Sequence, residues 1–382
     1  MAYTTIDDPS AHFQAVLWAG NGSNPRNITN TGNSDLKGDW IWTKNRTDAG
    51  TNNVTCNSTI GFDAPTGQGL SGGPYGGQLS TDSSGLASTP AATYGYVSAH
   101  LTNGFTVAAG GTNGDTCNAS GKDFVGFQWK AAGGTTSSNT DGNITTTLQT
   151  NSTAGFTIGT YTGAGSSPDN KTIGHGLGAI PDLVLIKGRD GSGLGGAAQY
   201  WIVGAPNTEV FGNGGNKHMF LDTTNALMDN STIWRSANFT STTIPLGGHA
   251  ALNGSGASYI FYAFKNIQGY SKFGTYIGNG NSDGPFIYTG FKPAFVIAKN
   301  TDATTSWRMN GPDGVFLSAD STDAVYDSAP GPIDRVSNGF KIRGGDDLRA
   351  SGGNFIYAAW ATNPFVTSTG VPTTAGSTGP AT

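Results

Sequence analysis

The sequence is poor in charge and almost devoid of glutamate. Only 12% of its 382 residues are charged, against about 25% in ordinary globular proteins, and Glu209 is the single glutamate. The residues that favour helices are therefore scarce, whereas Thr, Val, Ile and aromatic residues alternate with Gly, Asn, Asp and Pro. This composition predicts an all-β chain whose short strands are joined by tight turns.

Cysteines and clusters of basic residues are also scarce. Cys56 and Cys117 are the only cysteines, which excludes a disulfide framework and leaves two alternatives: small buried thiols, or one disulfide formed after release from a cell. The net charge of -5 and the lack of Lys/Arg clusters argue against nucleic-acid binding. No run approaches the roughly 18 apolar residues of a membrane-spanning helix, and residues 1–10 lack the regions of a signal peptide. We therefore expect neither membrane insertion nor export by that route.

What the sequence has instead is a threefold internal repeat, visible at five places. The first is an aromatic residue before a Gly-x-Gly turn, at 17–22, 160–165 and 275–280, and the second is an apolar strand ending in Lys44, Lys187 or Lys299. The third and weakest match is a short segment at 78–81, 220–223 and 316–319. The fourth match lies at 103–107, 237–240 and 338–342. The fifth is an aromatic strand at 124–129, 259–264 and 355–360. Because order and spacing agree, the chain is interpreted as three diverged copies of one unit.

The repeat predicts the division of the chain. An N-terminal arm at 1–10 precedes units at 11–130, 155–266 and 270–365, and a flexible tail follows at 366–382. Residues 131–154, between units one and two, are almost wholly Gly, Thr, Ser and Asn and are predicted to be a flexible linker. The connection between units two and three is short, because only residues 265–272 separate Phe264 from Phe273. We therefore expect units two and three to pack as a pair while unit one pivots.

The lysine-ended strand has two apolar faces. Trp40 and Trp42 fall on one face and Ile41 on the other, and residues 183–185 and 295–297 repeat the pattern. Such a strand is covered on both sides, by the facing sheet and by an adjoining segment or subunit. With frequent Gly and Pro turns, the pattern predicts three tandem antiparallel β-sandwich modules, jelly-roll-like in their connections, and a continuous solenoid is the lesser alternative.

Residues able to carry out catalysis are few. Glycosidases mostly need two carboxylates, so with one Glu the pair would be two aspartates, and both Asp7-Asp8 and Asp346-Asp347 are interpreted as solvated turn residues. No His-Glu-x-x-His motif occurs, and the turn at 163–165 lacks the third glycine of a nucleotide-binding loop. The sequence therefore predicts a non-enzymatic protein without catalytic residues or cofactors.

The histidines, the Asn/Asp-rich loops and the tryptophans are the candidate residues for metal and glycan sites. His175 is interpreted as shaping a turn, and residues 279–284 resemble the start of a calcium loop whose twelfth position, Gly290, is not the required Glu. We predict no metal site. Trp234 and Trp307 lie outside the strong repeat strands, each beside an arginine, and are the candidate glycan-contact residues because exposed aromatic rings stack on sugars.

Several segments resemble proteins of tailed bacteriophages of marine bacteria, of the cyanophage and pelagiphage type. They are GFTIGTYTG at 155–163, IGHGLG at 173–178, PDLVLIK at 181–187, GYSKF at 269–273 and the opening MAYTTIDDPS, with FQ at 13–14. The similarity covers most of the chain, although unit one departs from it with Gly38 in place of Pro and a Gly-rich stretch at 67–77. Such proteins are usually labelled virion structural or tail-fibre-like, so the resemblance implies a place on the outside of a phage particle.

The leading hypothesis is a non-enzymatic bacteriophage virion surface protein, a tail fibre or appendage that contacts the host surface. The protein would be assembled in the host cytoplasm and would bind other virion proteins. It is expected to form a homo-oligomer, with a trimer favoured, and its candidate ligand is a host surface glycan. A capsid decoration protein is the alternative, because the chain has no coiled-coil or triple-helical shaft. Two hypotheses belong to other functional classes. A tailspike polysaccharide depolymerase would place two Asp side chains in one groove. A cellular adhesin is disfavoured by the missing export signal.

Overall fold

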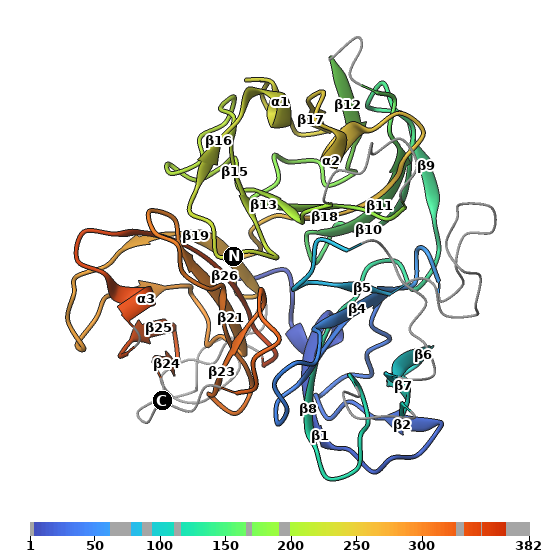
Figure 1. The fold of residues 1–382 in the computed structure, drawn as a ribbon, viewed down its shortest axis with the longest axis vertical. Helices are drawn as coiled ribbons and strands as arrows, with labels where there is room; N and C mark the ends of the chain where they lie inside the picture. Colours follow the sequence, from blue (N-terminus) through green and yellow to red (C-terminus); the bar gives the residue numbers. More distant parts are fainter. Residues whose placement is uncertain are drawn as a thin grey trace, which may run out of the picture.

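Antiparallel strands account for nearly all regular structure of the chain and form three lobes around a common centre (Figure 1). The computed structural model describes residues 4–61, 78–85, 94–110, 116–165, 170–190, 199–325, 332–344 and 346–363. Lobe one comprises the described residues of 11–130, lobe two those of 131–266 and lobe three those of 267–363. Every ladder between strands in these ranges is antiparallel, which confirms the all-β prediction.

Lobe one is a sandwich of a five-stranded and a three-stranded sheet. The large sheet has the order β1 (Phe13–Ala19), β8 (Asp123–Trp129), β3 (Trp40–Asn45), β4 (Val54–Asn57) and β5 (Leu79–Ser80). The small sheet has the order β2 (Arg26–Ile28), β7 (Gly104–Ala108) and β6 (Tyr96–Leu101), and a 3-10 turn at Pro9–Ala11 precedes β1.

Lobe three repeats this order strand for strand. Its large sheet runs β19 (Ser271–Ile277), β26 (Asn354–Trp360), β21 (Phe295–Asn300), β22 (Arg308–Asn310) and β23 (Phe316–Ser318). Its small sheet runs β20 (Phe286–Tyr288), β25 (Gly339–Ile342) and β24 (Ile333–Val336), and the short helix α3 (Asp346–Arg349) precedes β26.

Lobe two keeps the same five central strands and adds to both edges of the sheet. Its order is β16 (Met228–Asp229), β15 (Lys217–Phe220), β14 (Ile202–Gly204), β13 (Leu183–Gly188), β18 (Ser258–Phe264), β11 (Phe156–Thr162), β10 (Thr146–Asn151) and β9 (Ser137–Asn139). Its small sheet is the pair β12 (Lys171–Gly174) and β17 (Thr243–Leu246), beside the short helices α1 (Ser231–Trp234) and α2 (Ala250–Asn253).

Residues 131–154 do not form the flexible linker that their composition predicts. They contain β9 and β10, and β10 pairs with β11 from Thr147↔Thr160 to Asn151↔Phe156. Gln149 is buried there, and its Nε2 donates to the hydroxyls of Ser58 (3.0 Å) and Thr59 (2.8 Å) in lobe one. Backbone groups can pair with an open sheet edge whatever their side chains are, so the open edge of β11 outweighs the low strand preference of this segment.

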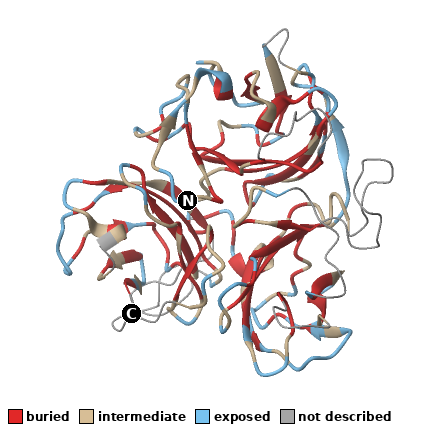
Figure 2. Ribbon diagram, in the orientation of Figure 1, coloured by how far each residue is buried: buried red, intermediate tan, exposed pale blue. Residues whose placement is uncertain are grey.

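One aromatic core joins the three lobes. The predicted two-sided burial is confirmed: Trp40, Trp42, Leu183, Leu185, Phe295 and Ile297 pack in this shared core, whereas Ile41, Val184 and Val296 pack inside their own lobes. In Figure 2, the strands of the large sheets that border the centre are coloured as buried. The second cover of each lysine-ended strand is therefore the rest of the same chain.

Each pair of lobes meets through aromatic rings in the shared core. The ring centroids are 4.4 Å apart for Trp40–Tyr262 (lobes one and two), 4.2 Å for Phe127–Phe295 (one and three) and 5.5 Å for Phe264–Trp360 (two and three). Residues of all three lobes also surround a small apolar void of about 30 Å³. The expectation that unit one pivots against a pair of packed units is therefore wrong, because lobe one packs against both others.

The N-terminal arm belongs to the same packing. Ile6 is buried in the shared core, and Thr4 Oγ1 donates to the carbonyl of Gln268 in lobe three (2.6 Å). Asp8 Oδ1 accepts the backbone N–H of Ser10 (2.9 Å) and so caps the 3-10 turn. The described part of the arm, residues 4–10, is thus not separate from lobe one, and the predicted tail at 366–382 lies outside the described residues.

Two of the five repeat matches are displaced in lobe two. The strand pairing aligns Met219 with Leu79 and Leu317. The segment of lobe two that corresponds to 78–81 and 316–319 therefore begins two residues before Phe220. The fourth match at 237–240 precedes the pairing strand, and Ile244 of β17 takes the place of Phe105 and Phe340. The other three matches occupy equivalent strands in all lobes.

Candidate functional site

The lysine that ends each repeated strand is buried at a boundary between lobes. Lys44, Lys187 and Lys299 have no exposed surface, although lysine is rarely buried. Their Nζ atoms donate to the carbonyl oxygens of Ser321 (3.1 Å), Ser83 (2.8 Å) and Thr224 (3.2 Å), respectively. The lysine of lobe one thus binds lobe three, the lysine of lobe three binds lobe two, and the lysine of lobe two binds lobe one. The three hydrogen bonds form a closed cycle around the molecule.

An aspartate lies at each of these boundaries, two residues after β5, β15 or β23. The carboxylates of Asp82, Asp222 and Asp320 accept the backbone N–H groups of Asn53 (2.9 Å), Trp201 (3.1 Å) and Trp307 (3.0 Å), respectively. Lys187 Nζ lies 4.0 Å from Asp222 Oδ2. The sequence showed this aspartate in each copy, but the displaced third match concealed it.

Burial dominates the electrostatics of these boundary groups. It raises the pKa of Asp82, Asp222 and Asp320 to about 6. It also lowers the pKa of Lys44, Lys187 and Lys299 to about 8. Both members of the Lys187–Asp222 pair shift toward neutrality, so loss of hydration outweighs their attraction. The three lysines connect neighbouring lobes, whereas the three aspartates accept backbone N–H groups of their own lobes.

The two tryptophans predicted to contact glycans are buried, and that prediction is wrong. Trp307 is 4% exposed, and its Nε1 donates to the carbonyl of Phe220 across the boundary between lobes two and three (2.7 Å). Trp234 is 1% exposed and packs edge-on against Phe239 at 5.1 Å inside lobe two. Neither indole offers a free face to a sugar ring. Trp201 occupies the position equivalent to Trp307 and donates to the carbonyl of Ser80 (2.8 Å).

The other residues singled out by sequence have structural partners. His175 is buried, and its Nδ1 accepts the N–H of Leu177 (3.2 Å), in agreement with a role in the turn. Asp347 is bound by the guanidinium of Arg308, with Nε at 2.8 Å and Nη2 at 2.6 Å from Oδ2. Cys56 and Cys117 are buried in the core of lobe one and are not joined by a disulfide, which matches the first of the two alternatives.

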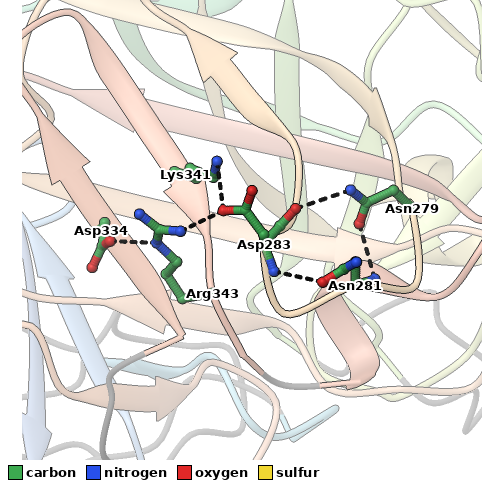
Figure 3. A network of polar contacts seen from close by, with 6 residues as sticks. All are labelled: Asn279, Asn281, Asp283, Asp334, Lys341 and Arg343. Carbon is green, nitrogen blue, oxygen red and sulfur yellow. Dashed lines mark hydrogen bonds and ion pairs between the residues drawn. The ribbon is translucent and has the colours of Figure 1, made fainter.

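The loop at 279–284 directs its polar groups to itself and to two cations. Asn279 Oδ1 accepts the N–H of Asn281 (3.0 Å), and Asn281 Oδ1 accepts the N–H of Asp283 (2.9 Å). The Asp283 carboxylate faces Lys341 and Arg343 (Figure 3), and this is unsuitable for calcium because both neighbours are positively charged. Within the described ranges, no three His, Cys, Asp or Glu residues come together as a metal site.

The outer face of the small sheet in lobe three exposes aromatic residues. Phe286 and Tyr288 on β20 are 48% and 59% exposed, and their cross-strand partners on β25 are Lys341 and Gly339. Strand β24 continues this face with Asp334 and Val336. We call these six residues the aromatic face. The intervening side chains point inward, because Ile287, Ile333, Phe340 and Ile342 fill the core of the lobe.

The aromatic face is specific to lobe three. The equivalent inward residues are Ile28, Ile173 and Ile287, which pair with Phe105, Ile244 and Phe340, respectively. On either side of the isoleucine, lobe one has Asn27 and Thr29, and lobe two has Thr172 and Gly174. Lobe three alone has Phe and Tyr there, at positions where burial does not require them.

Gly339 shapes the aromatic face. A Cβ atom at this position would lie 3.0 Å from Cε2 of Phe286 and 2.1 Å from the carbonyl oxygen of Ile287. The Phe286 ring therefore extends over β25 at a point where the sheet has no side chain. One side of the ring is supported by backbone, and the ring remains half exposed.

A charge-balanced network borders the aromatic face (Figure 3). Asp283 Oδ1 lies 2.8 Å from Lys341 Nζ and 2.6 Å from Arg343 Nη1, and Arg343 Nε lies 2.6 Å from Asp334 Oδ2. Lys341, and then Arg343, hold the pKa of the Asp283 carboxyl below its usual value. Two cations and two carboxylates thus form an exposed network with no net charge.

A groove of about 490 Å³ separates lobes two and three. Its lining includes Glu209, Lys217, Ile277 and Asp302. Lys217 Nζ donates to the carbonyl of Val210 (2.9 Å), and Asp302 Oδ2 accepts the N–H (2.8 Å) and Nδ2 (2.9 Å) of Asn354. Nothing in the sequence indicated that the single glutamate and an aspartate of another lobe would line one groove.

Comparison with known proteins assigns the family. In the described segments, no helix has the length and hydrophobicity needed to cross a membrane. No curated protein and no solved structure matches the chain. The sequence model of one family, described as "Domain of unknown function (DUF7483)", matches residues 8–364 and so spans all three lobes. The chain therefore belongs to the DUF7483 family.

Proposed function

We propose that the chain is a non-enzymatic surface protein of a bacteriophage virion, a tail fibre or appendage that contacts the host. The observation that carries this proposal is the aromatic face, a set of exposed rings found on one lobe of a body whose three lobes share a core. Such a body holds a specialised surface in a fixed orientation. The resemblance of several segments to virion proteins of marine phages supports the location.

The use of the buried ionisable groups supports a structural role. Lys44, Lys187 and Lys299 bind carbonyl oxygens of neighbouring lobes, and the three boundary aspartates accept backbone N–H groups. The buried lysines fix the position of one lobe on the next, because a lysine without these carbonyl partners would remain desolvated. The aspartates instead order the backbone of their own lobe beside each boundary.

A capsid decoration protein is the second candidate, and the rounded arrangement of the lobes favours it (Figure 1). Trp40, Leu183 and Phe295 turn toward one core within a single chain. The apolar faces that a homotrimer might have covered are thus covered without additional copies. A compact body of this kind suits a capsid lattice as well as an appendage.

A tailspike depolymerase is the enzymatic candidate, and the groove that contains Glu209 and Asp302 is where it would act. Glycoside hydrolysis needs two carboxylates on either side of one bond. Incubation with host polysaccharide should leave its viscosity unchanged under the leading proposal. A loss of viscosity that Glu209→Gln abolishes would establish the enzyme instead.

The location is tested on purified particles of the phage that encodes the chain. Mass spectrometry should find the protein in particles purified on a density gradient, and immunogold labelling should mark the tail or the capsid surface. Label on the tail supports the appendage, and label on the capsid supports decoration. Absence of the chain from purified particles, or labelling only after disruption of the capsid, would overturn the proposal.

A further inference from the structure

We propose that the aromatic face binds an uncharged pyranose sugar of a surface glycan. This inference rests on the proposed function for its biological setting and on the geometry of lobe three for its chemistry. It replaces the expectation that placed glycan contacts at Trp234 and Trp307, which are buried.

The two exposed rings supply a stacking surface. Phe286 and Tyr288 lie on the same face of β20, two residues and thus about 7 Å apart. The Phe286 ring approaches Gly339, where no side chain intervenes, and Phe286 is 48% exposed. The C–H groups of a pyranose can pack on such a ring, because an aromatic face is apolar and carries partial negative charge.

The network beside the rings favours a neutral ligand. The charges of Lys341 and Arg343 are balanced by those of Asp283 and Asp334, so no net field selects an anion or a cation. Each carboxylate has about four acceptor positions, and Asp283 and Asp334 retain some of them beside their ion pairs. Sugar hydroxyl groups can donate to these oxygens and accept from the adjacent N–H groups.

The small size of the aromatic face favours a sugar over a protein partner. A buried aromatic side chain covers about 150–250 Å², so two half-exposed rings offer on the order of 200 Å². A stable protein interface needs about 800 Å² from each partner. One or two sugar rings match the available area, and the charged residues around the rings suit hydroxyl groups better than an apolar protein surface.

The test uses the full chain and ligand-observed saturation-transfer NMR. The probes are the methyl glycosides of glucose, galactose and mannose, with methyl glucuronide as the charged comparison. The test variant is Phe286→Ala/Tyr288→Ala. The matched control is Tyr94→Ala, which removes a comparably exposed ring (53%) from lobe one. Circular dichroism verifies that each variant is folded.

We expect transfer from the protein to the C–H protons of at least one neutral glycoside. The double substitution should weaken binding about tenfold or more, whereas Tyr94→Ala leaves it unchanged. Because the ligand is uncharged, affinity should be the same in about 0.1 M and about 1 M NaCl.

Three results would overturn the inference. They are no transfer to any neutral glycoside, equal transfer in the double variant, and binding of methyl glucuronide alone with a strong dependence on salt. If sedimentation shows a dimer that the double substitution dissociates, the aromatic face is a protein interface instead. If the chain binds a sugar but is absent from purified particles, only the virion proposal is refuted. If the chain is present in particles but binds no neutral glycoside, only the sugar site is refuted.

Discussion

Replacing Trp40 by alanine should destabilise the whole chain and not lobe one alone. The indole is buried in the shared core and stacks on Trp129 of its own lobe (4.3 Å) and on Tyr262 of lobe two (4.4 Å). Removing a core tryptophan costs about 3–5 kcal/mol, and loss of stacking on both sides places this site at the upper end. Urea unfolding followed by far-UV circular dichroism and by tryptophan fluorescence should give coincident transitions, both shifted to lower urea.

A double-mutant cycle isolates the contact between lobes. The free energies of unfolding of Trp40→Leu, Tyr262→Leu and the double variant should reveal a coupling of about 0.5–1.5 kcal/mol. The control cycle pairs Tyr262→Leu with Trp18→Leu, a buried indole inside lobe one, and should show coupling near zero. A separate early transition for lobe one, or equal couplings in the two cycles, would refute the shared core as the unit of stability.

The remaining predictions concern the boundaries and the arm. Asp82, Asp222 and Asp320 have a folded-state pKa of about 6 against 3.8 as the ordinary value, so the stability they contribute is present below pH 3.8 and is lost as the pH rises through 6. The urea concentration at the unfolding midpoint should therefore decrease as the pH is raised from about 5 to about 7.5. Replacing all three aspartates by Asn should make this decrease smaller. An unchanged pH profile in the triple variant would contradict the raised pKa values of these aspartates. Lys187→Met leaves the carbonyls of Ser83 and Gln199 without this donor and removes the positive charge near Asp222, so it should lower the free energy of unfolding by about 3 kcal/mol in urea titrations, whereas the exposed Lys217→Met should have little effect. Deleting residues 1–10 removes Ile6 from the shared core and should cost about 2 kcal/mol in the same assay, and an undiminished midpoint would show that the arm is dispensable for folding.

Sequence alone could reveal the strands but not what covers them. The alternation of Trp40, Ile41 and Trp42 predicts a strand buried on both faces, and the structure places those faces in two different cores. A pattern of apolar residues carries no information on whether the cover is another subunit or another part of the chain. That choice depends on contacts between residues more than a hundred positions apart, such as Trp40 with Tyr262.

The errors in lobe two and in the supposed linker have physical causes. Phe220-Leu221 matches the apolar pair Phe316-Leu317 and the leucine of Gln78-Leu79 by composition, whereas the ladder of β14 and β15 aligns Met219 with those leucines. Aligning Met219 with Leu79 and Leu317 would have placed Asp82, Asp222 and Asp320 in register and shown a shared boundary residue. The Gly- and Thr-rich residues 131–154 were predicted to be unstructured because composition does not show that β11 has an open edge to pair with.

The candidate site was less predictable than the fold. Phe286 and Tyr288 flank an inward isoleucine in an ordinary alternating strand, and nothing local distinguishes them from core residues. Trp307 is predicted to be exposed because it lies outside the strong repeat strands and beside an arginine, yet its indole reaches across a boundary to the carbonyl of Phe220. Exposure depends on which lobe face is turned outward, and this becomes known only when the three lobes are assembled.

Joining the three lobes in one chain has a consequence for valency. Three identical subunits around an axis must all present the same surfaces, whereas three diverged copies in one polypeptide can change independently. The Phe and Tyr of lobe three, where the other lobes have Asn, Thr and Gly, give each molecule a single copy of the aromatic face. Under the virion role proposed above, strong attachment to a surface would depend on how many molecules a particle carries and on their spacing, because weak individual contacts add up only when several engage together.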